Sequence, residues 1–175
     1  FSELMLTTDN PCHDISVVSI NSENKLCDSL CCIQPEYDVI GRTMAELIID
    51  RIPEFGSIFL CAGNPKWDAH SLIVKGFDDY LAENRCPNLV YKDYSYSINR
   101  QNYLNIFNKL TRPDVAACCS VYSQGPVMLG QALEESKKAG KVYAVGSDLP
   151  DVTAKRLRRS VLNNVIQKNP YAQGY

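Results

Sequence analysis

The chain has 175 residues, of which 45% are hydrophobic and 22% charged, with 18 basic and 20 acidic side chains. This length and apolar content suit a folded domain with its own core, and they exclude wholesale disorder. A formal net charge of -2 argues against nucleic-acid binding by this segment alone. No apolar run approaches the roughly 20 residues that span a bilayer, so we expect no membrane partner.

Short apolar runs alternate along the chain with segments of helical periodicity. The expected strands cover residues 15–20, 29–34, 57–63, 88–94, 114–121, 141–147 and 160–166. Between them, apolar side chains recur at helical spacing from Ile40, Ile73, Tyr103 and Leu129, which predicts four amphipathic helices. Strands this apolar, separated by helices, are typical of βαβ units in a parallel sheet covered on both faces. We therefore predict an α/β, Rossmann-like doubly wound fold.

Polar residues stand where two helices are expected to begin. Asp68 and Asp151 are placed to cap the helices that follow them. The second of these helices carries the basic run KRLRR at residues 155–159, which is typical of a solvated face.

Eight cysteines constrain the redox environment of the protein. Five of them lie in the apolar stretches LCCI, FLCAG and AACCSV, where a free thiol packs as a small hydrophobic group. Cys118 and Cys119, as neighbours on a strand, would point to opposite faces and could hardly bond to each other. We therefore expect unpaired thiols and a reducing, cytoplasmic localisation.

A metal site can be drawn from some of the same cysteines. It would combine Cys12, His13 and Cys27 with Cys31 and Cys32. The spacing is not CxxC, and neighbouring strand residues face opposite sides of a sheet. We therefore expect no metal and no other cofactor.

The loops at the carboxyl ends of the strands are the candidate ligand site, because open α/β sheets bind their ligands there. Asp148 follows the strand at 141–147 and could accept hydrogen bonds from vicinal hydroxyls or cap the next helix. Trp67, the single tryptophan, stands next to Asp68 and near His70 in the loop NPKWDAH. Stacking and polar hydrogen bonds of this kind hold sugars, although a lid or a packing role at a helix start is the open alternative.

Catalytic motifs are missing from the sequence. It contains no GxSxG, no P-loop and no GxGxxG, and its two histidines stand outside any motif. We therefore expect a binding protein rather than an enzyme.

Six segments follow one another in a recognisable order: ISVVSIN, CIQPEYDVIGRTMAELI, SIFLCAGNP with KGFDDYL, RPDVAACCSVYSQGPVMLGQALEE, KVYAVGSDLPD and VIQKNPYAQGY. In this order they resemble the type 1 periplasmic-binding-protein fold of lactose-repressor (LacI) type regulators and ribose-type solute receptors. In that family two lobes close on a ligand, usually a sugar. The resemblance implies a remnant of the N-terminal lobe with a hinge crossing at 1–34, a complete C-terminal lobe at 35–163, and a return crossing at 164–175. Most of the first lobe would be missing.

The resemblance assigns ligand contacts to three positions that match the family pattern. Asp148 in VGSDLPD corresponds to the GFD aspartate, which hydrogen-bonds sugar hydroxyls. Asn21 falls where the family often has a polar contact after the first crossing strand. Asp38 corresponds to the aspartate of the D…GR pattern that opens the C-terminal lobe.

Other positions depart from that pattern. Ile73 replaces the usual arginine of R-x-x-G-F. Gln124 occupies the position of the usual Asn-Asp pair, and Tyr122 lies just before it. Lys168 occupies the position of a glutamine. A standard mode of pentose or hexose binding is therefore in question, and Lys168 could suit an anionic ligand or simply point into water.

The function that follows from the resemblance is effector sensing in a LacI-type transcriptional regulator. A sugar would close the lobes and shift a population of conformers, and a homodimer would couple this closure to DNA through a helix-turn-helix preceding Phe1. An exported sugar receptor of an ABC-type transporter, or the sensor lobe of a kinase, is the alternative. An α/β enzyme is a third reading.

Overall fold

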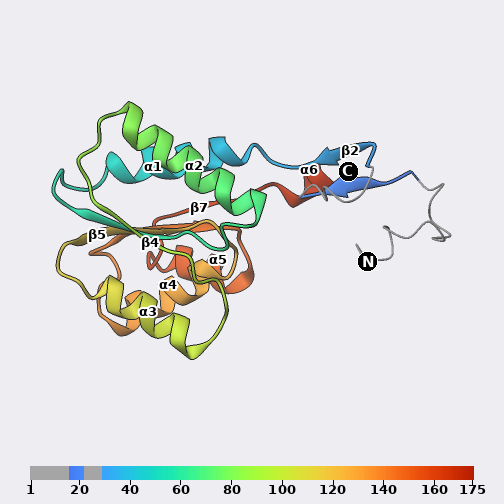
Figure 1. Cartoon of the computed structure of the whole chain (residues 1–175). Coiled ribbons are helices and arrows are strands. Elements are labelled where there is room, and N and C mark those ends of the chain that lie inside the picture. Colours follow the sequence, from blue (N-terminus) through green and yellow to red (C-terminus); the bar gives the residue numbers. More distant parts are fainter. Residues whose placement is uncertain (1–15, 22–28) are drawn as a thin grey trace. The chain divides into compact units, whose positions relative to one another are not determined.

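The computed structural model describes residues 16–21 and 29–175 (Figure 1). The chain divides into two compact units, Phe1–Glu36 with Asn169–Tyr175, and Tyr37–Lys168. Within the described residues, no helix combines the length and apolar character needed to cross a membrane.

The first unit contains a short parallel strand pair. β1 (Val18–Ile20) pairs with β2 (Cys31–Ile33), with Val18 opposite Cys31 and Ile20 opposite Ile33. The same unit contains the short helix α6 (Pro170–Gly174), whose first turn is capped by the side chain of Asn169. Both predicted strands of this region are confirmed over these shorter ranges.

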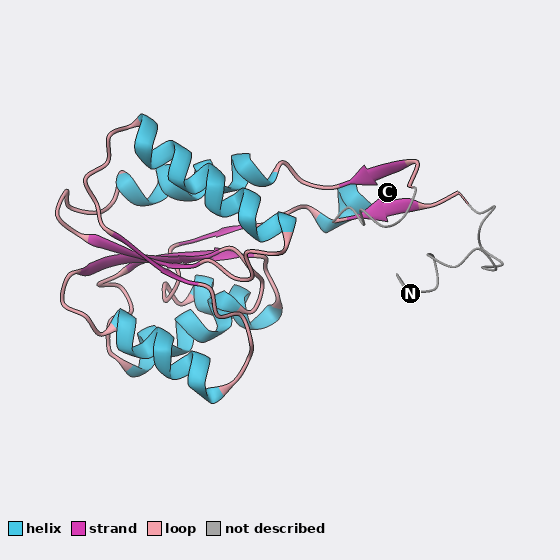
Figure 2. Ribbon diagram, viewed as in Figure 1, coloured by secondary structure: helices cyan, strands magenta, loops and turns pink. Residues whose placement is uncertain are grey.

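The second unit is a five-stranded parallel sheet with the order β4-β3-β5-β6-β7. Its strands are β3 (Ser57–Cys61), β4 (Val90–Asp93), β5 (Val115–Ser120), β6 (Tyr143–Ser147) and β7 (Asn164–Ile166). Its helices are α1 (Tyr37–Ile49), α2 (Asp68–Glu83), α3 (Arg100–Leu110), α4 (Gly125–Glu135) and α5 (Asp151–Arg158). Figures 1 and 2 show α1 and α2 on one face of the sheet and α3, α4 and α5 on the other. The predicted doubly wound α/β architecture is confirmed.

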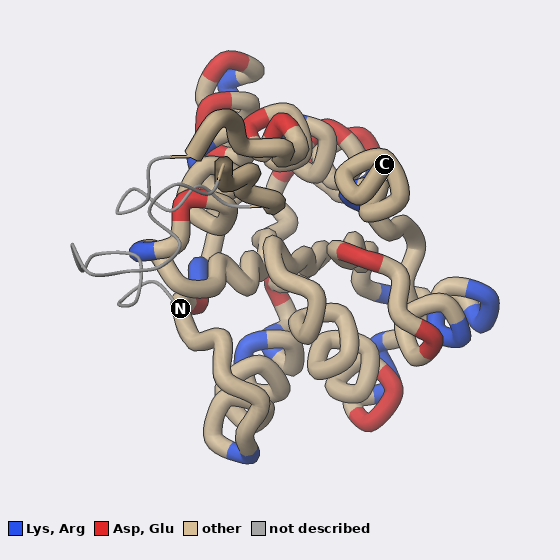
Figure 3. The backbone as a smooth tube through the Cα atoms, turned by 90° about the vertical axis from the view of Figure 1, so that its right-hand side faces the viewer, with Lys and Arg blue, Asp and Glu red and all other residues tan. Residues whose placement is uncertain are grey.

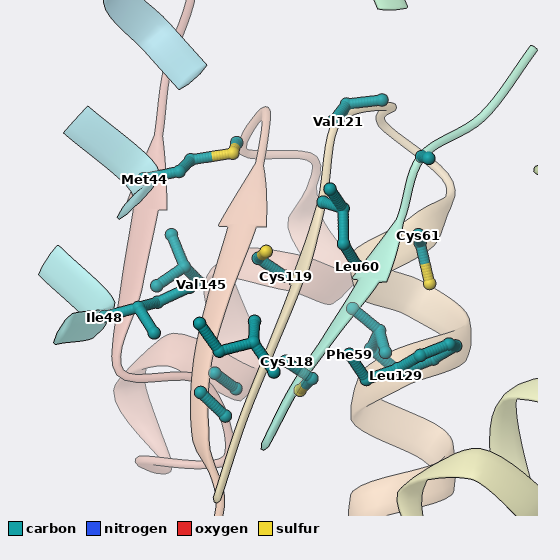
Figure 4. Packing of buried hydrophobic residues seen from close by; sticks show 14 of the residues in the cluster. Met44, Ile48, Phe59, Leu60, Cys61, Cys118, Cys119, Val121, Leu129 and Val145 are labelled. Carbon is teal, nitrogen blue, oxygen red and sulfur yellow. The ribbon is translucent and has the colours of Figure 1, made fainter. Parts of the chain in front are cut away.

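Each face of the sheet buries alternate strand residues under its own helices. Figure 4 shows Met44 and Ile48 of α1 beside Val145, whereas Phe59 and Leu129 pack together on the α4 side. All five residues are fully buried or nearly so, as is every residue of β3. This two-sided burial explains why the strands read as continuous apolar runs rather than as alternating ones.

The buried thiols belong to this core. Cys61, Cys118 and Cys119 are fully buried, and burial raises the pKa of all three thiols. The six described cysteines are all free, and these three pack as small hydrophobic groups as predicted. The same prediction is wrong for Cys31, which is exposed on β2, because this strand pair covers little of its own surface.

The predicted aspartate caps are wrong by one residue. The N-cap of α2 is Trp67 and that of α5 is Pro150, and neither makes a side-chain capping hydrogen bond. Asp68 and Asp151 are instead the first helical residues. A carboxylate there still suits the positive end of the helix dipole.

Charge is distributed unevenly between the two halves of the second unit. Residues 37–99 contain nine acidic and six basic side chains, whereas residues 100–168 contain five acidic and eleven basic ones. Figure 3 shows basic positions spread over the lower helical layer. Part of the KRLRR run is structural rather than solvated: Arg156 and Arg159 of this run both pair with Glu134 of α4, and Arg156 also donates to the carbonyl oxygen of Val127.

Helices α1 and α2 cross at two glycines. A Cβ on Gly41 would overlap the carbonyl oxygen of Ile73, and one on Gly76 would overlap that of Asp38. In both cases the obstacle is backbone, which cannot rotate away as a side chain can. The two helices can approach this closely only because both positions lack a side chain.

We expect Gly41→Ala to lower the free energy of unfolding by about 1–3 kcal/mol, since overpacking forces the helices apart. Val39→Ala is the matched control, because Val39 lies two residues away on α1 and is 46% exposed. Chemical denaturation measures both variants. An unchanged midpoint for Gly41→Ala would contradict the close crossing.

Candidate functional site

The order of the strands creates a topological switch point between β3 and β5. From β3 the chain passes through α2 to β4, which pairs with one side of β3. β5 pairs with the other side of β3. Helices α3 and α4, which precede and follow β5, lie on the face of the sheet opposite to α2. Because the strands are parallel, their carboxyl ends share one edge, and in open α/β sheets the ligand-binding crevice lies where the winding reverses. The loops that begin at Gly63 and Val121 stand at this position.

His70 in the first turn of α2 is fixed by the loop that follows β3. The backbone N–H of Asn64 donates to its Nδ1 at 2.9 Å. A neutral ring that accepts at Nδ1 carries its proton on Nε2, which leaves Nε2–H as a donor. Gly63 permits this contact, since it has φ +68° and a Cβ there would lie 2.5 Å from Nδ1. Burial and the nearby charge of Lys168 lower the pKa of His70.

Four rings, which we call the aromatic wall, form a continuous series: Trp67, His70, Tyr96 and Tyr122. Ring centroids are 5.0 Å apart for Trp67 and His70, 5.1 Å for Trp67 and Tyr96, and 5.8 Å for His70 and Tyr122. His70 and Tyr122 are buried, whereas Trp67 and Tyr96 are 51% and 40% exposed. The aromatic wall therefore runs from the interior of the lobe into solvent.

Tyr122 anchors the inner end of the aromatic wall. Its hydroxyl donates to the carbonyl oxygen of Ser95 at 3.1 Å, and its backbone N–H donates to Ser120 Oγ at 3.3 Å. Burial raises the pKa of its hydroxyl, so the phenol stays neutral. The bond to Ser95 ties the loop after β5 to the loop after β4.

A partly buried ion pair lies beside Tyr122. Lys168 Nζ is 3.2 Å from Asp148 Oδ2 and 3.5 Å from the carbonyl oxygen of Val121. Asp148 adopts a left-handed backbone conformation, φ +63°, which aspartate tolerates better than most residues, and its N–H donates to Ile166. Its carboxylate is thereby directed to Lys168, and Pro150 rather than Asp148 is the N-cap of α5.

The remaining predicted site residues lie elsewhere. Asn21 belongs to the first unit. Asp38 is exposed in the first turn of α1. Hydrogen bonds to Glu83 and Asp79 are the main reason that the pKa values of Arg42 and Lys75 are raised, and the charge of Asp38 adds a smaller effect. Gln124 is exposed at the start of α4, and Asp68 is exposed beside Trp67. The structure thus brings together Trp67, His70, Tyr122, Asp148 and Lys168, and no described contact joins Asp38 or Gln124 to them.

Sequence reasoning missed two contributors to this edge. Tyr96 lies in the loop after β4, which the strand-end rule could have nominated along with the others. Ser147 is fully buried at the end of β6, and its hydroxyl has no hydrogen-bond partner among the described residues. No sequence signal distinguishes this serine from a packing residue.

The described part of the chain contains no group of His, Cys, Asp and Glu side chains suited to a metal ion. Cys12, His13 and Cys27, the other members of the metal site considered from the sequence, lie outside the described residues.

Comparisons with known proteins agree on one kind of domain. A family model described as a periplasmic binding protein domain matches residues 13–175. No curated protein matches the chain.

Solved structures resemble the chain in fold at low sequence identity. A periplasmic component of an ABC-type sugar transport system from Hahella chejuensis gives a TM-score of 0.84 at 14% identity, covering 94% of this chain and 60% of that one. GanP, a glucose-galactose binding protein from Geobacillus stearothermophilus, gives a TM-score of 0.79 at 18% identity, and the match covers 93% of this chain and 59% of that one. A carbohydrate transporter solute binding protein from Agrobacterium radiobacter, in complex with D-arabinose, gives a TM-score of 0.76 at 23% identity. This match covers 94% of this chain and 58% of that one. The chain spans less than two thirds of the length of these structures.

The lowered pKa of His70 predicts a specific pH dependence of stability. The unfolded chain binds a proton at the ordinary pKa of 6.5 and the folded lobe only at lower pH, so stability is complete above 6.5 and falls as the pH decreases below it. In His70→Asn the amide oxygen can replace Nδ1 as the acceptor. We expect the free energy of unfolding of this variant to fall less steeply below pH 6.5, down to the pH at which carboxylates begin to protonate. Urea denaturation across pH measures this slope, and equal slopes for both proteins would contradict the assignment.

Proposed function

Since the chain belongs to the family of periplasmic binding protein domains, we propose that it is the sugar-binding part of a solute receptor that serves an ABC-type transporter. It has the type 1 periplasmic-binding-protein fold, as predicted. The three solved structures described above carry sugar-receptor names, which supports this receptor reading over a LacI-type regulator.

The observation that carries the proposal is the aromatic wall beside the Asp148–Lys168 pair at the switch point. A sugar offers an apolar ring face and a rim of hydroxyls, so it needs a stacking surface next to paired donors and acceptors. Exposed Trp67 and Tyr96 supply stacking surface, Asp148 accepts hydrogen bonds and Lys168 donates them. His70 adds the Nε2–H donor.

In this proposal the sugar forms no covalent bond with the protein. The ligand would contact this lobe and a second lobe together, and it would favour a closed arrangement by its higher affinity for that arrangement. Asn21, Asp38, Asp68 and Gln124 stay in the proposal as further contacts with the sugar.

A LacI-type regulator is the second candidate, and the free thiols favour it. The six described cysteines carry no disulfide, which suits a reducing cytoplasm better than an oxidising exterior. Sequencing the gene upstream of Phe1 distinguishes the two candidates. A helix-turn-helix supports a cytoplasmic DNA-binding homodimer, whereas a cleavable leader supports the receptor.

Trp67 gives a direct test of the site, because it is the only tryptophan of the chain. We expect D-galactose or D-arabinose to change its fluorescence in the full-length protein. Asp148→Ala should weaken binding by about 1–3 kcal/mol in calorimetry, since it removes an acceptor for the sugar hydroxyls.

Asp151→Ala is the control, since this exposed carboxylate lies three residues away and outside the crevice. Equal affinity of the wild type and Asp148→Ala would refute the site. Failure of every sugar to bind the full-length protein would refute the function.

A further inference from the structure

The loop between β4 and α3, residues 94–99, carries Tyr96, an outer ring of the aromatic wall. The side chain of Tyr96 is 40% exposed, and the centroid of its ring lies 5.1 Å from that of Trp67. A ring this exposed has little packing to hold it in place. The position of Tyr96 therefore depends on how the backbone of its loop is held.

Two buried side chains hold that backbone on either side of Tyr96. The Tyr122 hydroxyl donates to the carbonyl oxygen of Ser95 at 3.1 Å, and Asn102 Nδ2 donates to that of Ser97 at 2.9 Å. Tyr122 is 4% exposed and Asn102 is 3% exposed. We call this pair of hydrogen bonds the loop clamp. It fixes the backbone one residue before and one residue after Tyr96, whose ring can still turn about its side-chain torsions.

Other hydrogen bonds shape only the two ends of the loop. The Ser95 N–H donates to Asp93 Oδ1 at 2.9 Å, and the Asn102 N–H donates to Asn99 Oδ1 at 2.8 Å. The first bond forms a local turn and the second caps α3, and neither involves the Asn102 amide group. Loss of that amide would therefore release the middle of the loop and leave its ends in place.

The stability of α3 does not by itself explain Asn102. Asparagine is a poorer helix former than leucine, and Asn102 Oδ1 is buried with no hydrogen-bond partner among the described residues. A buried acceptor left in this way costs free energy that an apolar side chain of the same shape would not cost. The hydrogen bond that the Asn102 side chain does donate goes to the loop that carries Tyr96.

We propose that Asn102 is a positioning residue of the candidate sugar site, which keeps Tyr96 beside Trp67 through the loop clamp. Asn102 itself contacts no ligand. It orders part of the stacking surface before a sugar arrives, so less conformational entropy is lost on binding. The effect on affinity rests on the proposed function, whereas the placement of Tyr96 can be measured without any sugar.

Asn102→Leu tests this placement, because leucine has the same branched shape but no donor for the Ser97 carbonyl oxygen. Trp67 is the only tryptophan, so its fluorescence reports on the ring beside it. In the ligand-free, full-length protein we expect Asn102→Leu to increase the quenching of Trp67 by acrylamide, as Tyr96→Ala does by removing the neighbouring ring. Unchanged quenching in Asn102→Leu would overturn the proposal.

A double variant separates positioning of Tyr96 from a general loosening of the lobe. In the Tyr96→Ala background we expect Asn102→Leu to cause no further increase in quenching, because the ring that it positions is gone. Additive increases would overturn the proposal.

Asn105→Leu is the matched control. Asn105 lies one turn further along α3, and its side chain accepts a hydrogen bond from Gln101 rather than contacting the loop. We expect this variant to leave the quenching of Trp67 unchanged. An increase equal to that of Asn102→Leu would assign the effect to α3 in general and would overturn the role given to Asn102.

Calorimetry with D-galactose or D-arabinose tests the effect on binding. We expect Asn102→Leu to weaken binding about two- to tenfold, which corresponds to the cost of ordering one side chain on binding. Wild-type affinity in this variant would overturn the positioning role. If the wild type binds no sugar, the proposed function fails, and the quenching experiment still decides whether Asn102 places Tyr96.

Tyr122→Phe keeps the proposal testable if Asn102→Leu fails to fold. It removes only the hydroxyl that forms the other half of the loop clamp. We expect increased quenching of Trp67, which again disappears in the Tyr96→Ala background. No increase in Tyr122→Phe would overturn the loop clamp.

Discussion

Parallel pairing of β3 with both β4 and β5 is the constraint from which the site follows. It places every strand end on one edge of the sheet, and it puts the crossover from β3 to β4 through α2 on one face and the crossover from β4 to β5 through α3 on the other. A crevice at that edge is then a geometric consequence of the winding. Side chains distant in the sequence, such as His70, Tyr122 and Lys168, meet there because each follows a different strand.

Backbone contacts hold the inner part of this edge in place. Asn64 N–H fixes the ring of His70, and the Ser95 carbonyl oxygen fixes the hydroxyl of Tyr122. These contacts define which atoms are offered to a ligand before it arrives, which reduces the entropy lost on binding. Trp67 and Tyr96, which are half exposed, are the members of the aromatic wall free to adjust.

Periodicity in the sequence determined the α/β class, all seven strands and four of the helices between them, because burial on both faces leaves continuous apolar runs. It also placed Trp67, His70, Tyr122, Asp148 and Lys168 at strand ends. It did not determine which of the nominated residues meet: the ion pair of Asp148 with Lys168 depends on β6 and β7 being neighbours and on the left-handed turn at residue 148. Asp38 and Asn21 matched family positions, yet their surroundings are set by the α1–α2 packing and by the first unit. Only the tertiary structure decides such contacts, since they depend on the order of strands in the sheet, whereas local periodicity reports only which side of each element is buried.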